Sequence, residues 1–206
     1  MEKIFNLNLE AQENIIIASK EKLVALELKK LAKNLLKSVK TRKDFAEKEI
    51  TLAEIRKEMV ENNYKLLEKK IDSKEILNFS EEVIKKEREF INYHEKIAEN
   101  QLELAKHHRE IAELEEKLAK SKIILADSKI QVASIRLKIG KLQKKFINAT
   151  QKKTPEKAMI IKHQYKEEEE KLNHQVKDVI EKENRVKMLQ NDIAKITTKL
   201  SQTLIK

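Results

Sequence analysis

Apolar residues recur at every seventh position through the middle of the chain. The series has eleven members, and all of them are apolar: Ile76, Val83, Phe90, Ile97, Leu104, Ile111, Leu118, Leu125, Val132, Ile139 and Phe146. Chance does not produce such a run in a sequence of which 40% is hydrophobic. A sustained seven-residue repeat is typical of helices that supercoil around their neighbours to the left. The pattern predicts one long helix over about residues 74–148.

Two further series of the same period flank the first. The one before it has a single polar member: Ile17, Val24, Leu31, Ser38, Phe45, Leu52, Met59 and Leu66. The one after it has none: Ala158, Tyr165, Leu172, Val179, Val186, Ile193 and Leu200. These series predict helices near 10–70 and 155–205.

Helix-start signals support the two breaks between these helices. Asp72 can cap a helix whose Glu75 reaches back, as in a capping box. Thr154 is suited to the N-cap, Pro155 to the first helical position and Glu156 to the first turn. Short connections make consecutive helices antiparallel neighbours.

Small residues follow the apolar series in two of the helices. In the first helix they are Ala18, Ala25, Ala32, Val39, Ala46 and Ala53, and in the second Ala98, Ala105, Ala112, Ala119, Ala126, Ala133 and Gly140. Small side chains in register let two backbones approach closely, so we expect these helices to pack on each other. The expected fold is all-α, an elongated antiparallel three-helix coiled coil. It forms one domain over 1–206, with 1–9 as a short N-terminal extension.

The composition narrows the possible classes of protein. The 206 residues include one Gly, one Pro and no Cys, which argues against sheets, Gly-rich phosphate loops, disulfides and thiolate metal sites. No apolar run approaches the ~18 residues that span a bilayer. The first residues do not resemble a signal peptide, so we expect a soluble or peripheral protein.

Charge is concentrated in one part of the chain. Between Lys117 and Lys166 there are fourteen Lys or Arg and only two acids, Asp127 and Glu156, so this segment has a formal charge of +12. The net charge of the whole chain is +10, so the rest of the chain has −2. The excess lies around the connection between the second and third helices, and its self-repulsion favours an anionic partner. A smaller basic cluster over residues 29–43 fits a solvated helix surface better than a binding site.

The residues give no sign of catalysis or of a cofactor. His107 and His108 are adjacent, so they point about 100° apart on a helix and do not converge on a metal as a zinc site requires. A serine nucleophile elbow needs glycines that the chain lacks. We therefore expect no enzyme activity, no metal, no cofactor and no small-molecule substrate.

The three long heptad helices and the lysine-rich second connection resemble a BAR domain. The resemblance includes the segment 141–172, KLQKKFINATQKKTPEKAMIIKHQYKEEEEKL. It implies an antiparallel homodimer that binds an anionic, curved membrane. The residues that match lipid-contacting lysines of the family's tip are Lys141, Lys144, Lys145, Lys152, Lys153 and Lys157, with Lys129, Arg136 and Lys138 nearer the concave face. Size and Lys/Ile/Asn bias are also similar to microsporidian spore-wall proteins of BAR type.

Two other interpretations stay open. A structural coiled-coil protein without a membrane role (cytoskeletal, spore-wall or assembly scaffold) explains the heptads but not the concentrated charge. A binder of polyanions or glycosaminoglycans explains the charge, whereas nucleic acid is not expected because base-stacking aromatics are few. The expected location is cytoplasmic and peripheral to a membrane, or else a spore wall or a layer next to the plasma membrane.

Overall fold

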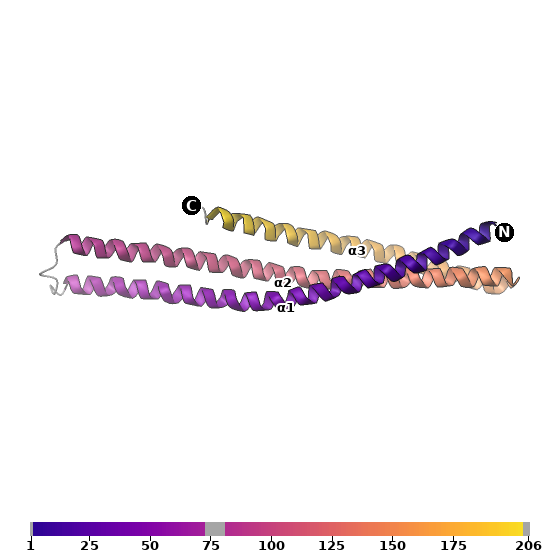
Figure 1. The fold of residues 1–206 in the computed structure, drawn as a ribbon, viewed down its shortest axis with the longest axis horizontal. Coiled ribbons are helices and arrows are strands. Elements are labelled where there is room, and N and C mark those ends of the chain that lie inside the picture. The colour runs from indigo at the N-terminus through magenta and orange to yellow at the C-terminus, as the bar shows by residue number, and fades with distance from the viewer. Residues whose placement is uncertain (1, 73–80, 204–206) are drawn as a thin grey trace. The chain divides into compact units, whose positions relative to one another are not determined.

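In a computed structural model (Figure 1), the described residues of the chain form three α-helices. The structure describes residues 2–72 and 81–203, with side chains for 6–72 and 81–201. The helices are α1 (Glu2–Asp72), α2 (Glu81–Gln151) and α3 (Pro155–Thr203). No strand occurs among the described residues. The all-α class and the three helices are therefore confirmed.

The helix ends differ from the expected ones in detail. α1 begins at Glu2, so residues 2–9 are its first turns rather than an extension before it. α2 runs to Gln151, slightly beyond the expected end at 148, and α3 begins at Pro155 as predicted. The expected start of the second helix near 74 and its Glu75 lie outside the described residues, whereas Asp72, the expected cap, is the last residue of α1.

Contacts divide the chain into two units. Unit 1 comprises Met1–Lys37 and Lys117–Asn191, and unit 2 comprises Ser38–Glu116 and Asp192–Lys206. Each unit contains a segment of all three helices.

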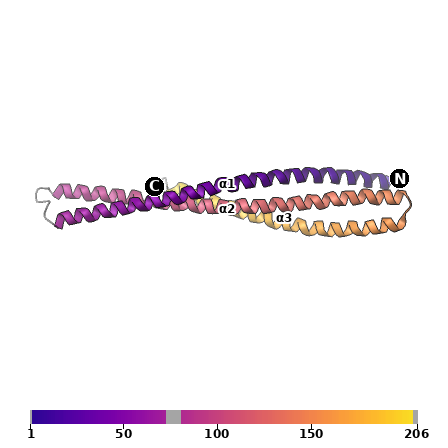
Figure 2. The ribbon, with the colours of Figure 1, turned by 90° about the horizontal axis from the view of Figure 1, so that it is seen from below.

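Within unit 1, α2 contacts both other helices. Asn14 donates a hydrogen bond to Gln143 (3.2 Å), and Lys29 pairs with Asp127 (2.6 Å). From the first pair to the second, the residue number rises along α1 and falls along α2, so these segments run antiparallel. On the other side Ser128 of α2 donates to Asp178 of α3 (3.0 Å). Figure 2 shows the α2 and α3 segments joined by their short connection.

Within unit 2, polar pairs again join α1 to α2 in the antiparallel sense. They are Arg42 with Glu115 (2.9 Å), Glu49 with His108 (2.9 Å) and Glu68 with Arg88 (2.9 Å). The first two pairs are seven residues apart on both helices, so the polar contacts repeat with the same period as the apolar series.

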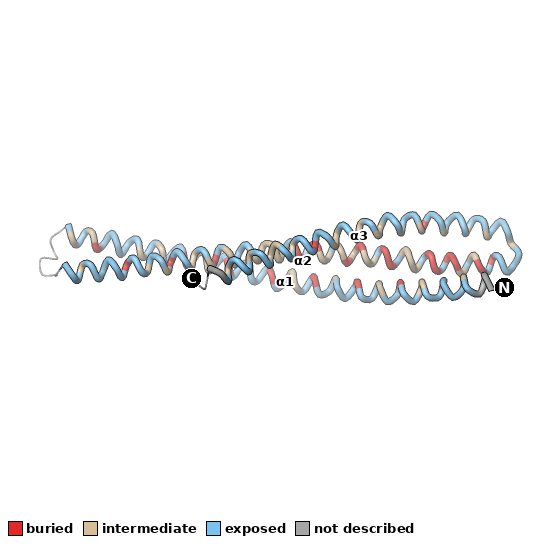
Figure 3. The backbone as a smooth tube through the Cα atoms, turned by 90° about the horizontal axis from the view of Figure 1, so that it is seen from above, coloured by how far each residue is buried: buried red, intermediate tan, exposed pale blue. Residues whose placement is uncertain are grey.

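Small side chains fill the contact between α1 and α2 in each unit, as predicted. In α1 the buried positions are Ala11, Ala18, Ala25, Ala32, Val39, Ala46 and Ala53, none more than 3% exposed. In α2 they are Ala98, Ala105, Ala112, Ala119, Ala126 and Ala133, again none above 3%. Figure 3 shows buried positions recurring along α1 and α2. Small residues at these positions let the two backbones approach closely.

Gly140 occurs where this approach is closest. A Cβ atom at that position would lie 2.7 Å from Cγ1 of Ile15 and 3.1 Å from the carbonyl oxygen of Ala11. Even an alanine would therefore overlap α1, which explains the one glycine of the chain.

The large apolar residues of α1, unlike its alanines, are not covered by this packing. Their exposed fractions fall between 49% and 64% for Ile17, Val24 and Leu31 in unit 1 and for Phe45, Leu52, Met59 and Leu66 in unit 2. One residue step turns a helix by about 100°. Burial of the alanine positions against α2 therefore turns the apolar positions toward solvent.

The end of α2 is closed by a Schellman motif. The amide of Lys153 donates to the carbonyl of Thr150 (3.1 Å), and the amide of Thr154 donates to the carbonyl of Ala149 (3.1 Å). Lys153 has a φ of 53°, in the left-handed region where glycine is usual.

Thr154 takes part in both helix ends. It precedes Pro155 as the predicted N-cap residue of α3, but its hydroxyl donates to the carbonyl of Ala149 (3.0 Å) and not to the first turn of α3. Its own carbonyl accepts from the amide of Ala158 (3.1 Å), which starts the hydrogen bonding of α3. The chain thus reverses direction within residues 152–154.

Substitution of Lys153 by glycine should stabilise the protein. Glycine removes the steric cost of the left-handed backbone, so we expect Lys153→Gly to raise the free energy of unfolding by about 1 kcal/mol. Lys153→Ala removes the same charge and keeps the strain, and it should change stability by less than about 0.5 kcal/mol. Urea unfolding followed by circular dichroism measures both, and equal stability of the two variants would contradict the prediction.

Candidate functional site

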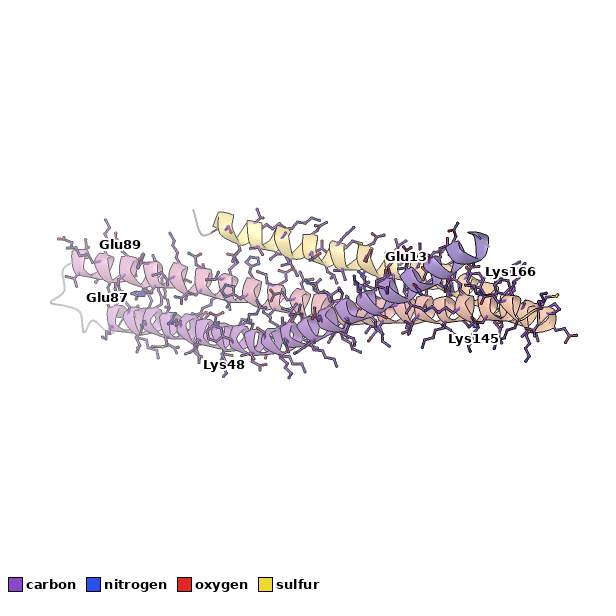
Figure 4. The ribbon with its side chains drawn as sticks, turned by 45° about the vertical axis from the view of Figure 1, so that its right-hand side comes forward. Glu13, Lys48, Glu87, Glu89, Lys145 and Lys166 are labelled. Carbon is purple, nitrogen blue, oxygen red and sulfur yellow. The ribbon has the colours of Figure 1, made fainter. Side chains whose placement is uncertain are left out.

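Six lysines surround the connection between α2 and α3, and we call them the turn lysines. They are Lys141, Lys144 and Lys145 at the end of α2, Lys152 and Lys153 in the connection, and Lys157 at the start of α3. All are exposed except Lys144, which is half-buried. Among the described residues, none of the six forms an ion pair. Figure 4 labels Lys145 of this group, and Lys166 further along α3.

The backbone of the connection brings these lysines together. Because the chain reverses at residues 152–154, the last turns of α2 and the first turn of α3 lie side by side. Within residues 141–157 the sequence contains these six lysines and one acid, Glu156. Cations packed at this density and without acidic partners repel one another, which favours binding of an anion.

The other three residues predicted to contact lipid are paired with acids of the same unit. Lys129 pairs with Glu183 (2.7 Å), and Lys138 pairs with Glu168 (2.8 Å). Arg136 pairs with Glu21. These three cations therefore do not belong to the unpaired group. The acids come from other helices, so sequence spacing gave no signal of the pairing.

Glu168 is the most deeply buried acid of the candidate region. Only 5% of the residue is exposed, and it accepts hydrogen bonds from Lys138 and Lys171, both at 2.8 Å. These bonds, from Lys138 first, hold the pKa of the Glu168 carboxyl below its usual value. The pair Lys138–Glu168 joins α2 to α3.

A second polar group joins the same helices further from the connection. Lys182 donates to Asp178 (2.6 Å) and to Ser128 (2.7 Å), and Ser128 is buried in α2. The hydrogen bonds from Lys182 and Ser128 lower the pKa of Asp178. Polar contacts between two helices, such as this half-buried group, favour one register.

Near the turn lysines a third polar group links all three helices. The side chain of Gln143 is buried, accepts from Asn14 of α1 (3.2 Å) and donates to the hydroxyl of Tyr165 on α3 (3.3 Å). Burial, and then a hydrogen bond with Glu169, raise the pKa of Tyr165 to about 12. A small cavity of about 200 Å³ lies beside this group. The turn lysines thus extend from a fixed three-helix base.

The smaller basic cluster of α1 is partly neutralised within each unit. Lys29 pairs with Asp127 in unit 1. Arg42 and Lys43 pair with Glu115 and Glu116 in unit 2, at 2.9 Å and 3.6 Å. This agrees with the interpretation of that cluster as a helix surface.

Three histidines, His107, His108 and His163, lie within 4 Å of carboxylates, and His94 packs against the rings of Phe90 and Tyr93. His108 lies 2.9 Å from Glu49, and His163 lies 3.4 Å from Glu167. In the parts of the chain that the structure describes, no three His, Cys, Asp or Glu side chains are grouped to hold a metal ion. Over the same residues, no helix has a stretch apolar enough to pass through a bilayer.

Compared with family models, with curated proteins and with solved structures, the chain matches none of them. A function can therefore be assigned only from its own residues and their geometry.

The buried carboxylate of Glu168 should make stability depend on pH. Its pKa is lower in the folded than in the unfolded chain, so it stabilises the fold above the unfolded value of about 4.3. That contribution is lost as the pH falls through the folded pKa. We expect Glu168→Gln to be less stable than the wild type at pH 7 and to lose less stability on acidification.

The exposed Glu170 offers a matched control on the same helix. Glu170→Gln should follow the wild-type profile of stability against pH, measured by urea unfolding at successive pH values. A Glu168→Gln profile parallel to the wild-type profile would show that this carboxylate does not contribute to the pH dependence.

Proposed function

We propose that the chain is a peripheral membrane-binding protein of BAR type, which contacts anionic lipid through the turn lysines and acts as a homodimer. The observation that carries the membrane contact is the difference in pairing. The six turn lysines have no acidic partner among the described residues, whereas Lys129, Arg136 and Lys138 each have one. Unpaired cations lose no internal ion pair when they bind an external anion.

The magnitude of this attraction is sufficient for reversible binding. Each lysine near an anionic leaflet contributes about 1 kcal/mol. Six of them at one turn supply several kcal/mol without a pocket for a particular headgroup, and two copies of the chain supply twice as much. Attraction between exposed charges is screened by salt, so the proposed contact weakens as ionic strength rises.

The uncovered apolar surface of unit 2 supports the proposal that two copies of the chain associate. In unit 2 the exposed residues Phe45, Leu52, Met59 and Leu66 recur with the seven-residue period of a helix that packs on another helix. Beside them a groove of about 790 Å³, which Met59, Leu66 and Phe90 help to line, opens between α1 and α2. The core of unit 2 is mainly alanine, whose burial contributes little per residue.

Charge favours unit 2 over unit 1 for self-association. By sequence, unit 1 has 26 Lys or Arg against 14 Asp or Glu, a formal +12, whereas unit 2 has 19 against 21, a formal −2. Two copies of unit 2 can approach with little repulsion, whereas two copies of unit 1 repel strongly.

A binder of soluble polyanions would use the same turn lysines. Measuring the binding of heparin and of anionic vesicles at equal ionic strength distinguishes this function from membrane binding. Affinity for heparin without binding to vesicles would favour the polyanion function. Binding to neither would favour a structural coiled coil.

Charge reversal at the turn should abolish vesicle binding. The variant carries Lys144→Glu, Lys145→Glu, Lys152→Glu and Lys153→Glu. Loss of four contributions of about 1 kcal/mol each weakens binding by at least ~100-fold. Cosedimentation with vesicles of phosphatidylserine and phosphatidylcholine measures this, and vesicles of phosphatidylcholine alone should bind neither protein.

Unit 1 also contains lysines for a matched control. Lys22, Lys30, Lys33 and Lys177 are exposed, form no described ion pair and lie away from the α2–α3 connection. Their reversal to Glu changes the net charge equally and should leave most of the binding intact. Equal loss in both variants would mean that net charge, and not the turn, attracts the membrane.

Lysines placed on the uncovered apolar face of unit 2 should prevent dimerisation. We expect sedimentation equilibrium to show a dimer for the wild type and a monomer for the double variant Leu52→Lys/Met59→Lys. The control Thr51→Lys/Asn62→Lys adds the same charge at exposed polar positions of α1 and should remain dimeric. A monomeric wild type at micromolar concentration would contradict the homodimer.

A further inference from the structure

Two uncovered apolar side chains lie directly beside the turn lysines. Met159 is 73% exposed and Ile160 is 60% exposed. Met159 is more exposed than any other large hydrophobic residue that the structure describes. Both follow Lys157 in the first turns of α3, which begins at Pro155.

The direction of these side chains follows from the packing of α3. Ala158 and Ile161 are half-buried, as is Tyr165, and these positions form the side of α3 that faces its neighbours. Met159 and Ile160 lie on the other side of the helix because each residue step turns it by about 100°. No part of unit 1 covers them.

This apolar patch is too short to bind another helix. The residues that share its face are Glu156, His163 and Glu167, and all three are exposed and polar. His163 and Glu167 pair with each other at 3.4 Å. A helix partner requires apolar residues that repeat over several turns, as they do on α1, and this face has only one pair.

A lipid surface can accept a single pair of apolar side chains. Lysine side chains carry their charge at the level of the headgroups, while neighbouring apolar side chains enter the boundary between headgroups and acyl chains. The unpaired lysines on both sides of Met159 in the chain, including Lys153, Lys157 and Lys162, match the charge of an anionic leaflet. Glu156 is the single acid within this group and is exposed to water.

We propose that Met159 and Ile160 insert into the interfacial layer of an anionic membrane while the turn lysines bind the phosphate groups of the lipids. This proposal rests on the proposed membrane-binding function and adds a second, apolar component to it. The contact then keeps part of its affinity at salt concentrations that screen the lysines.

The absence of tryptophan from the chain permits a direct test. In the variant Met159→Trp the new indole is the only tryptophan. On mixing with vesicles of phosphatidylserine and phosphatidylcholine, its emission should shift to shorter wavelength, and lipids brominated on their acyl chains should quench it. Insertion places the indole among groups less polar than water, which causes both effects.

Met188 provides the matched control. It is also a methionine of α3 in unit 1, it is 66% exposed, and it lies 29 residues further along the helix, on the order of 44 Å. The variant Met188→Trp should bind the same vesicles without an emission shift or quenching. A shift in both variants would indicate a general change of structure and would overturn the proposal.

Affinity gives a second measurement. Met159→Ser/Ile160→Ser should bind vesicles at least about tenfold more weakly than the wild type, since burial of one such side chain already contributes more than a factor of ten. The variant Met188→Ser should bind as the wild type does.

Each failure has a distinct outcome. If the wild type does not bind anionic vesicles, the proposed function fails, and insertion fails with it. If Met159→Trp binds but its emission remains that of an indole in water, only insertion fails. An emission shift that depends on protein concentration and needs no lipid would instead place Met159 in a contact between two copies of the chain.

Discussion

Close packing of small residues between α1 and α2 is the constraint on which each unit depends. Alanines at every seventh position of both helices are almost fully buried, and Gly140 leaves no room even for a methyl group. Because the two backbones are close, polar side chains beside the alanines can pair between α1 and α2, as Glu49 and His108 do. The same geometry leaves the large apolar residues of α1 on the outside, where no other part of their unit buries them.

The connection between α2 and α3 depends on a different backbone feature. A Schellman motif with Lys153 in the left-handed conformation ends α2, and Pro155 begins α3 directly afterwards. The reversal is so short that lysines from both helix ends and from the connection share one surface. Acids from neighbouring helices neutralise Lys129, Arg136 and Lys138, which lie earlier in α2. At the connection there is only Glu156, so the charge there stays unpaired.

Much of the fold could be predicted because helix signals are local. The seven-residue series, the small residues that follow them and the Thr154-Pro155 break specified three helices, the partner of α1 and the start of α3. Thr154 lies at the predicted N-cap position of α3, but its hydroxyl bonds to Ala149 at the end of α2, which becomes evident only when both helix ends are in place. The candidate site was predictable in part, because the density of lysines is visible in the sequence while their pairing is not.

The sequence by itself determined the helical class, the seven-residue period and the position of the excess positive charge, because each follows from residues close together in the chain. The tertiary structure decided which cations are neutralised and which apolar side chains are covered. Arg136 pairs with Glu21, Lys138 pairs with Glu168, and Met159 remains 73% exposed. Each of these facts depends on the rotation of one helix against another, and a rotation of one residue step, about 100°, would exchange paired for unpaired positions.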